Sequence, residues 1–199
     1  KVSDRLTDIA ELIVNEALAL AWAQITERHG VPQYSEQEPN GAAGQDTQNS
    51  HDAGGAHQSV QNVASAPPAG GPVVEGVGET RDTATNLKTA SMIVVAYGKL
   101  GGLELGYGSD LDLVFLHDSS GEYQRTNGRQ PVENSVFFQR LAQRLVHLLT
   151  VHTAAGRLYE VDTRLRPGGN RGLLVQTLKG FREYEFKEAW TWEHQSLLR

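Results

Sequence analysis

The chain has 199 residues, enough for one moderate domain or for a core with an extension. Its 18 basic and 24 acidic side chains give a formal net charge of -6, which supplies no broad positive surface for nucleic acid. It contains no cysteine, which excludes disulfides and thiolate metal sites and fits a reducing compartment.

The sequence also bears on location. No apolar run approaches the ~20 residues that a membrane span needs, and no secretory signal peptide, with its charged and then apolar segments, is visible. We therefore expect a cytoplasmic protein without a membrane partner. The chain begins with Lys1, has Met92 as its only methionine, and ends inside a predicted helix, so we interpret it as a fragment of a longer protein.

Residues 3–30 are predicted to form an amphipathic helix, with Ser3 as its N-cap and Gly30 and Pro32 ending it. Its apolar side chains recur at spacings of three and four and form one stripe, namely Leu6, Ile9, Ile13, Ala17 and Leu20. Such a stripe needs a partner surface. We therefore expect residues 1–34 to be a helical unit that docks on the core.

Residues 35–88 differ sharply in composition from the rest of the chain. They are rich in Gly, Ala, Gln, Asn, Ser and Pro and have almost no large aliphatic residue. Such a segment buries too little apolar surface to offset its ordering entropy, so it is predicted to be a disordered insert. His51 and His57 lie within it and are interpreted as solvated residues, not metal ligands.

The predicted catalytic core spans residues 89–180 and mixes short strands with one helix. Strands are expected at 92–96, 111–116, 157–162 and 173–176, and an amphipathic helix at 133–150. A further helix is expected from 181, so residues 181–199 are interpreted as the start of a helical region. The fold class predicted is α+β, a small mixed or antiparallel sheet with flanking helices.

The stretch "GYGSDLDLVFLHD" (106–118) carries two aspartates at the start of a predicted strand. Side chains alternate across a strand, so Asp110 and Asp112 share one face, while Leu111, Leu113 and Phe115 point to the other. Two ionised carboxylates this close repel each other unless a cation lies between them. The pair therefore suggests a Mg²⁺ site, although Asp-x-Asp is common and is often only a solvated face.

The residues upstream of the pair favour the magnesium interpretation. Gly98, Gly101 and Gly102 permit close approach of the backbone to a phosphate, and Lys99 lies among them. Ser109 abuts the first aspartate and offers a hydroxyl. Neither a P-loop pattern nor a dinucleotide-binding pattern is present.

A third carboxylate would strengthen the site, and Asp162 at the end of "LYEVD" is the best candidate. Glu160 points to the same side of that predicted strand and is its rival. An ordinary ion pair with Arg164 or Arg166 would also explain Asp162. Arginines near a triphosphate bind phosphate oxygens as well, so both interpretations stay open.

Together, "AYGKLGGLEL", "GYGSDLDLVFLHD", "LYEVDTRLRPGG" and "EAWTWEHQ" resemble the glutamine synthetase adenylyltransferase family, within the DNA polymerase beta-like nucleotidyltransferase superfamily. The resemblance covers residues 1–34 and about 91–199. It implies a glycine pair at Gly101 and Gly102, and a catalytic, metal-binding triad of Asp110, Asp112 and Asp162. "KVSDRLT" and the aspartate stretch are more similar to the C-terminal, adenylylating copy of the catalytic domain than to its adenylyl-removing sister copy.

The resemblance implies transfer of AMP from ATP to a tyrosine hydroxyl of glutamine synthetase, with two Mg²⁺ ions, in the control of nitrogen assimilation. A PII-type signalling protein and glutamine would be the regulators. Gly98, Lys99, Ser109, Arg164 and Arg166 are the auxiliary phosphate-binding candidates. Alternatives are the adenylyl-removing copy, a nucleotidyltransferase for RNA or a small molecule, and a catalytically silent nucleotide-binding module.

Overall fold

The structure, a computed structural model, describes residues 1–35, 62–65 and 87–196. It opens with the long helix α1 (Val2–His29), whose buried stripe includes Val14, Leu18 and Ala21. The helix begins one residue earlier than predicted, and Lys1 instead of Ser3 is its N-cap. Gly30, with φ 75, ends it as expected.

By length and composition alone, α1 could cross a membrane, with a mean hydropathy of 1.2 over its most apolar window. No segment of that kind was expected from the sequence. A helix of a protein core meets the same criterion, and α1 packs along α3 (Asn134–Thr150) through its buried stripe. Trp22 of α1 meets Phe137 of α3 edge to face, with ring centroids 5.4 Å apart.

The central sheet has five strands. Its order is β2 (Asn62–Ser65), β4 (Met92–Tyr97), β5 (Leu111–His117) and β7 (Val161–Asp162), and β8 (Val175–Thr177) also pairs with β5. β4 lies antiparallel to β2 and to β5, whereas β7 and β8 lie parallel to β5. The mixed sheet and its flanking helices confirm the predicted fold class.

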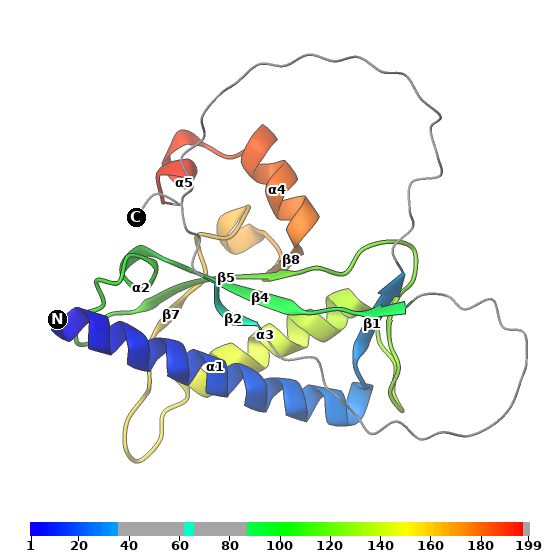
Figure 1. Ribbon diagram of the computed structural model, residues 1–199, viewed down its shortest axis with the longest axis horizontal. Helices are drawn as coiled ribbons and strands as arrows, with labels where there is room; N and C mark the ends of the chain where they lie inside the picture. Colours follow the sequence, from blue (N-terminus) through cyan, green and yellow to red (C-terminus); the bar gives the residue numbers. More distant parts are fainter. Residues whose placement is uncertain (36–61, 66–86, 197–199) are drawn as a thin grey trace, which may run out of the picture.

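Helices cover both faces of this sheet, with α1 and α3 on one side and α4 (Leu178–Lys187) and α5 (Thr191–Ser196) on the other (Figure 1). Residues of β5 alternate between the two layers. Leu111, Leu113 and Phe115 enter the larger core with α1 and α3. Val114 and Leu116 enter a smaller cluster that includes Phe181 of α4. Asp110 and Asp112 follow the phase of this second face.

A second sheet of three antiparallel strands lies beside the first, in the order β3 (Leu87–Thr89), β1 (Pro32–Ser35) and β6 (Gln124–Thr126). Its link to α3 is direct, because the Asn134 amide donates to the Gln33 carbonyl over 2.9 Å. The remaining described elements are α2 (Gly98–Gly101) and a 3-10 turn at Gly169–Arg171.

Several predictions on the elements need correction. Within the segment expected to be a disordered insert, residues 62–65 form β2, which adds to the edge of the central sheet. Most of that segment, including His51 and His57, lies outside the described residues. Of the strand expected at 157–162, only Val161–Asp162 pairs, and the helix expected from 181 is divided into α4 and α5.

Candidate functional site

Three aspartates meet where β5 begins. Asp110 directly precedes β5, Asp112 is its second residue, and Asp162 ends β7. The parallel register of the two strands places Asp112 beside Asp162. One carboxylate oxygen from each aspartate lies within 4.8 Å of the others. The structure therefore brings together the three carboxylates that the sequence analysis proposed.

The charge of this cluster is only partly compensated. Burial raises the pKa of Asp112, and the neighbouring Asp110 and Asp162 carboxylates raise it further. Hydrogen bonds from Arg164 lower the pKa of Asp162; the Arg164 Nε donates to Asp162 Oδ2 over 2.7 Å. Lys99 and Arg166 add weaker favourable charge interactions, with Asp112 and Asp162 respectively. The three carboxylates are a set of hard oxygen donors that fits a divalent cation such as Mg²⁺.

The glycine turn lies against this cluster for a steric reason. Gly98 has a φ of +56, and a Cβ built on it would stand 2.4 Å from Asp112 Oδ2. A residue with a side chain would therefore press on the carboxylate itself. Gly98 lets the backbone of α2 approach Asp112 closely, which is the freedom that the sequence analysis had assigned to phosphate binding.

Two cavities meet at Asp110. One has a volume of about 470 Å³ and is lined by Gly98, Lys99, Gly102, Glu104, Asp110 and Asp112. The other has a volume of about 350 Å³ and is lined by Asp110, Glu160, Val161, Asp162, Thr163, Arg164 and Asn170. The acidic cluster therefore separates a glycine-rich, lysine-bearing cavity from one that carries an arginine and an asparagine.

Not every predicted site residue lies in these cavities. Gly101 lines neither, and the Ser109 hydroxyl accepts a hydrogen bond from the Gly106 amide over 3.1 Å. Arg166 donates to the Thr163 carbonyl over 2.6 Å and lines a different cavity, next to α3. Glu160 lines the second cavity but forms an ion pair with Arg157 and is not one of the three converging acids.

Sequence reasoning missed four cavity residues, namely Val161 and Thr163, which flank Asp162, and Glu104 and Asn170, which lie in loops. Glu104 reaches the glycine side because Leu103 adopts a φ of 59, unusual for a non-glycine residue, and the Glu104 amide then donates to the Lys99 carbonyl over 2.8 Å. Asn170 belongs to the 3-10 turn after β7. Both positions depend on loop conformation, for which the sequence pattern carried no signal.

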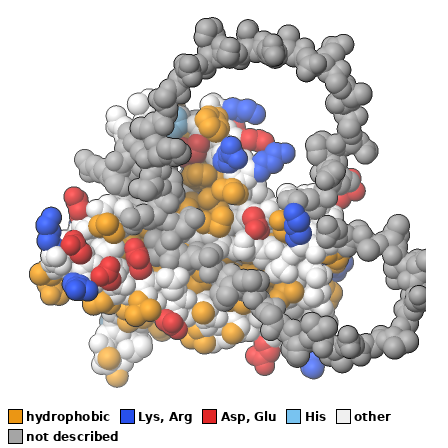
Figure 2. Space-filling model, in the orientation of Figure 1, with side chains coloured by type: hydrophobic (Ala, Val, Ile, Leu, Met, Phe, Trp, Pro, Cys, Tyr) orange, Lys and Arg blue, Asp and Glu red, His pale blue; other side chains and the backbone are white. Residues whose placement is uncertain are grey.

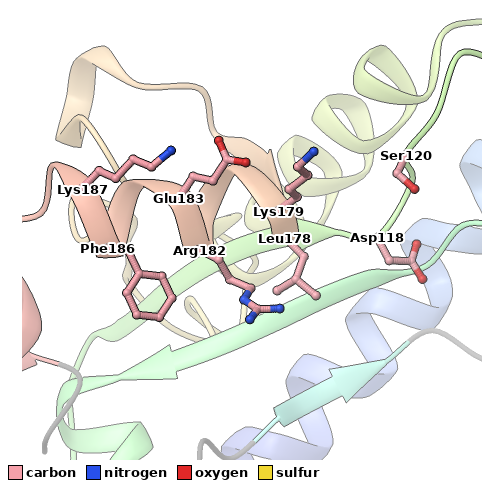
Figure 3. A pocket seen from close by; sticks show the side chains of 8 residues that line it. All are labelled: Asp118, Ser120, Leu178, Lys179, Arg182, Glu183, Phe186 and Lys187. Atoms are coloured by element: carbon pink, nitrogen blue, oxygen red, sulfur yellow. The ribbon is translucent and has the colours of Figure 1, made fainter. Parts of the chain in front are cut away.

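A further cavity, of about 470 Å³, is lined by none of the predicted site residues. It lies between α4 and the end of β5, and Phe186, Leu178 and Arg182 point into it while Glu183 and Lys179 point away (Figure 3). The space-filling view shows hydrophobic side chains gathered beneath basic ones in the region of α4 (Figure 2). Its chemistry differs from that of the acidic cluster.

A mixed sheet that carries three converging aspartates beside a glycine turn is the arrangement expected of a polymerase beta-like nucleotidyltransferase. Comparison with known proteins agrees. The model of the glutamate-ammonia ligase adenylyltransferase family matches residues 73–199. The chain therefore belongs to this family.

Curated relatives carry the name bifunctional glutamine synthetase adenylyltransferase/adenylyl-removing enzyme. The protein of Thioalkalivibrio sulfidiphilus is 45% identical over 199 residues, which is 100% of this chain and 16% of the relative. Those of Pseudomonas putida and Hahella chejuensis are each 41% identical over the whole chain. The chain thus spans 15% to 16% of the length of these relatives.

Proposed function

We propose that this chain carries a nucleotidyltransferase site that transfers AMP from ATP to a tyrosine hydroxyl of glutamine synthetase, with release of pyrophosphate. The observation that carries the proposal is the convergence of Asp110, Asp112 and Asp162 within 4.8 Å beside the glycine turn. The names of the curated relatives support both the adenylyl chemistry and glutamine synthetase as the protein substrate.

The two cavities suggest separate binding sites for the triphosphate of ATP and for the acceptor hydroxyl. Lys99 and the backbone of Gly98 and Gly102 line the first cavity, where a cation and close backbone approach suit the triphosphate of ATP. Asp162 lines the second cavity, which we assign to the acceptor hydroxyl. Asp110 lines both cavities and can bind a metal ion from either side.

The three carboxylates would hold Mg²⁺, two ions in the proposed mechanism. Bound there, the metal would neutralise the phosphate charge and lower the pKa of the attacking hydroxyl. Hydrogen bonds from Arg164 lower the pKa of Asp162, which keeps its carboxylate ionised and able to hold a metal ion. Because this shift also makes Asp162 a weaker base, it could accept the proton of the acceptor hydroxyl only once a bound metal had lowered the pKa of that hydroxyl. The hydroxyl oxygen then bonds to the α-phosphorus, and the bond to pyrophosphate breaks.

Labelled ATP, Mg²⁺ and purified glutamine synthetase test this proposal. The wild-type chain is compared with the double variant Asp110→Asn/Asp112→Asn, with circular dichroism as the folding control. We expect AMP incorporation to fall by more than about 100-fold in the variant, since both changes remove metal-binding charge. A folded double variant that labels its target at the wild-type rate would contradict the site assignment.

The adenylyl-removing activity in the relatives' name is the second candidate. A parallel reaction with adenylylated glutamine synthetase and inorganic phosphate separates the two, because it measures AMP release. RNA and aminoglycosides serve as negative acceptors. A PII-type protein and glutamine as regulators, and a cytoplasmic location without membrane or nucleic-acid partners, are further parts of the proposal that follow from the sequence analysis.

A further inference from the structure

A groove lined by basic side chains lies between the C-terminal part of α1 and the helix α3. It has a volume of about 500 Å³, its charged lining residues are Arg28, Arg140 and Arg144, and two histidines, His29 and His147, line it as well. The other lining residues are neutral, namely Gln24, Ile25 and Gln143. Within the part of the chain that the structure describes, no acidic residue lines the groove, although the whole sequence has a net charge of -6.

Each arginine in the groove is held by a neutral partner. The Arg28 Nε donates to Gln130 Oε1 over 2.6 Å. The Arg144 Nε donates to Gln24 Oε1 over 2.7 Å. Among residues 1–35, 62–65 and 87–196, no ion pair joins any of the three arginines to a carboxylate. Their charges are therefore positioned but not neutralised.

Arg140 is held by a buried histidine. His29 is only 3% exposed, and its Nδ1 lies 2.7 Å from the Gln130 carbonyl oxygen. A carbonyl oxygen only accepts, so Nδ1 carries the hydrogen and the neutral ring presents Nε2 as an acceptor. Arg140 donates to that Nε2 over 2.8 Å. The histidine thus orients the guanidinium toward the groove without compensating its charge.

This arrangement is unfavourable without a counterion. Arg140 and Arg144 stand one turn apart on α3, and a like-charge pair at that spacing destabilises a helix. Arg28 adds a third positive charge from α1. Each guanidinium uses only one of its several N–H donors in the hydrogen bond described, so most of its N–H groups remain available to a ligand.

We propose that the groove between α1 and α3 binds a small anion that carries a phosphate group. Planar guanidinium groups recognise phosphate oxygens by paired N–H donors, and the three positive charges of this groove are more than enough to balance the two negative charges of a phosphate dianion. The groove is separate from the acidic cluster, because none of its lining residues lines either of the cavities that meet at Asp110. The proposal does not rest on AMP transfer.

Titration of the chain with sodium phosphate tests this proposal, with sodium chloride at equal ionic strength as the reference and with EDTA present. The readout is the arginine Nε–H and backbone amide resonances in ¹H–¹⁵N spectra. We expect saturable shifts at Arg28, Arg140 and Arg144. The variants Arg140→Gln and Arg28→Gln should each weaken phosphate binding by about tenfold, the loss of one charge-assisted contact.

Two controls make the result specific. Arg182→Gln removes an exposed arginine from α4, on the opposite side of the central sheet, and should leave phosphate binding unchanged (Figure 1). Arg5→Gln removes an exposed arginine from the N-terminal end of α1, outside the groove lining, and should also bind phosphate as the wild type does. Shifts that rise linearly without saturation, or equal binding by folded Arg140→Gln and wild type, would overturn the proposal. Both arginines substituted, Arg28 and Arg140, are exposed, so their loss spares the core, and the backbone spectrum verifies folding.

Discussion

Replacing Gly98 by alanine separates the folding role of the glycine turn from its role at the acidic cluster. The backbone φ of +56 costs an L-residue roughly 1–2 kcal/mol in the left-handed region. The added Cβ would also stand 2.4 Å from Asp112 Oδ2. That oxygen is the end of a short side chain, so the carboxylate can rotate away at modest cost. Rotation removes it from the position that Mg²⁺ binding requires.

We therefore expect Gly98→Ala to lower the free energy of unfolding by about 1–2 kcal/mol and to weaken Mg²⁺-dependent ATP binding far more than this loss explains. Urea unfolding and ATP titration with and without Mg²⁺ measure the two effects. Gly108→Ala is the matched control, since Gly108 has a φ of +70 but nothing within 4 Å of its built Cβ. Equal ATP affinities for the two folded variants would refute the steric argument.

Three further predictions concern the acidic cluster and the core. Without Mg²⁺, Asp112→Asn should stabilise the fold at pH 7 by up to about 1 kcal/mol, allowing for solvent screening. The reason is that burial and two neighbouring like charges disfavour the wild-type carboxylate. Urea unfolding measures this effect, and a destabilised variant would contradict it. Burial lowers the pKa of His117 to about 4 from the usual 6.5, so at a pH between these two values His117 binds a proton when the protein unfolds. The stability due to neutral His117 is complete above pH 6.5 and is lost as the pH falls toward 4, at most about 3 kcal/mol. His117→Phe should flatten the fall in unfolding free energy over that pH range, and parallel curves for variant and wild type would rule the explanation out. Phe138 is fully buried and stacks on His117 with centroids 4.7 Å apart, so Phe138→Ala should cost about 3–5 kcal/mol in chemical unfolding, whereas Tyr107→Ala, at an 86% exposed position, should cost little.

The elements that the sequence predicted best are those with a strong period or a buried apolar run. The strand alternation through Leu111, Leu113 and Phe115 emerges in the larger core. The helix was predicted, but of its expected apolar stripe only Leu6, Ile13 and Ala17 pack against that core, whereas Ile9 and Leu20 are exposed. Patterns of this kind report which residues are buried, and burial dominates folding. The edge strand β2 (Asn62–Ser65) was missed because its sequence, "NVAS", lies in a segment with little apolar content, and its position depends on pairing with β4.

The acidic cluster could be predicted only in part from the sequence. Alternation along one strand places Asp110 and Asp112 on the same face, and this needs no tertiary information. The choice between Glu160 and Asp162 does need it, because both point to one side of a predicted strand. The structure distinguishes them through the parallel register of β5 and β7, which pairs Asp112 with Asp162, while Glu160 forms an ion pair with Arg157.

The different roles of Arg164 and Arg166 also depend on tertiary structure and could not be predicted from the sequence. Asp162 both pairs with Arg164 and joins the cluster, so the ion pair and the metal site are compatible in one geometry. Arg166, two residues later, turns to the Thr163 carbonyl, and no feature of "TRLRP" distinguishes the two guanidinium groups in advance. The Arg164 guanidinium donates several hydrogen bonds to Asp162, whereas that of Arg166 donates to Thr163 and Gly172. Arg164 and a bound Mg²⁺ would share the Asp162 carboxylate. If the two cations compete for it, removing the Arg164 guanidinium should tighten Mg²⁺ binding. Arg164→Gln measured against Arg166→Gln by Mg²⁺ titration decides the point: a tighter site in the first variant alone supports competition, and equal affinities would show that Arg164 only orients Asp162.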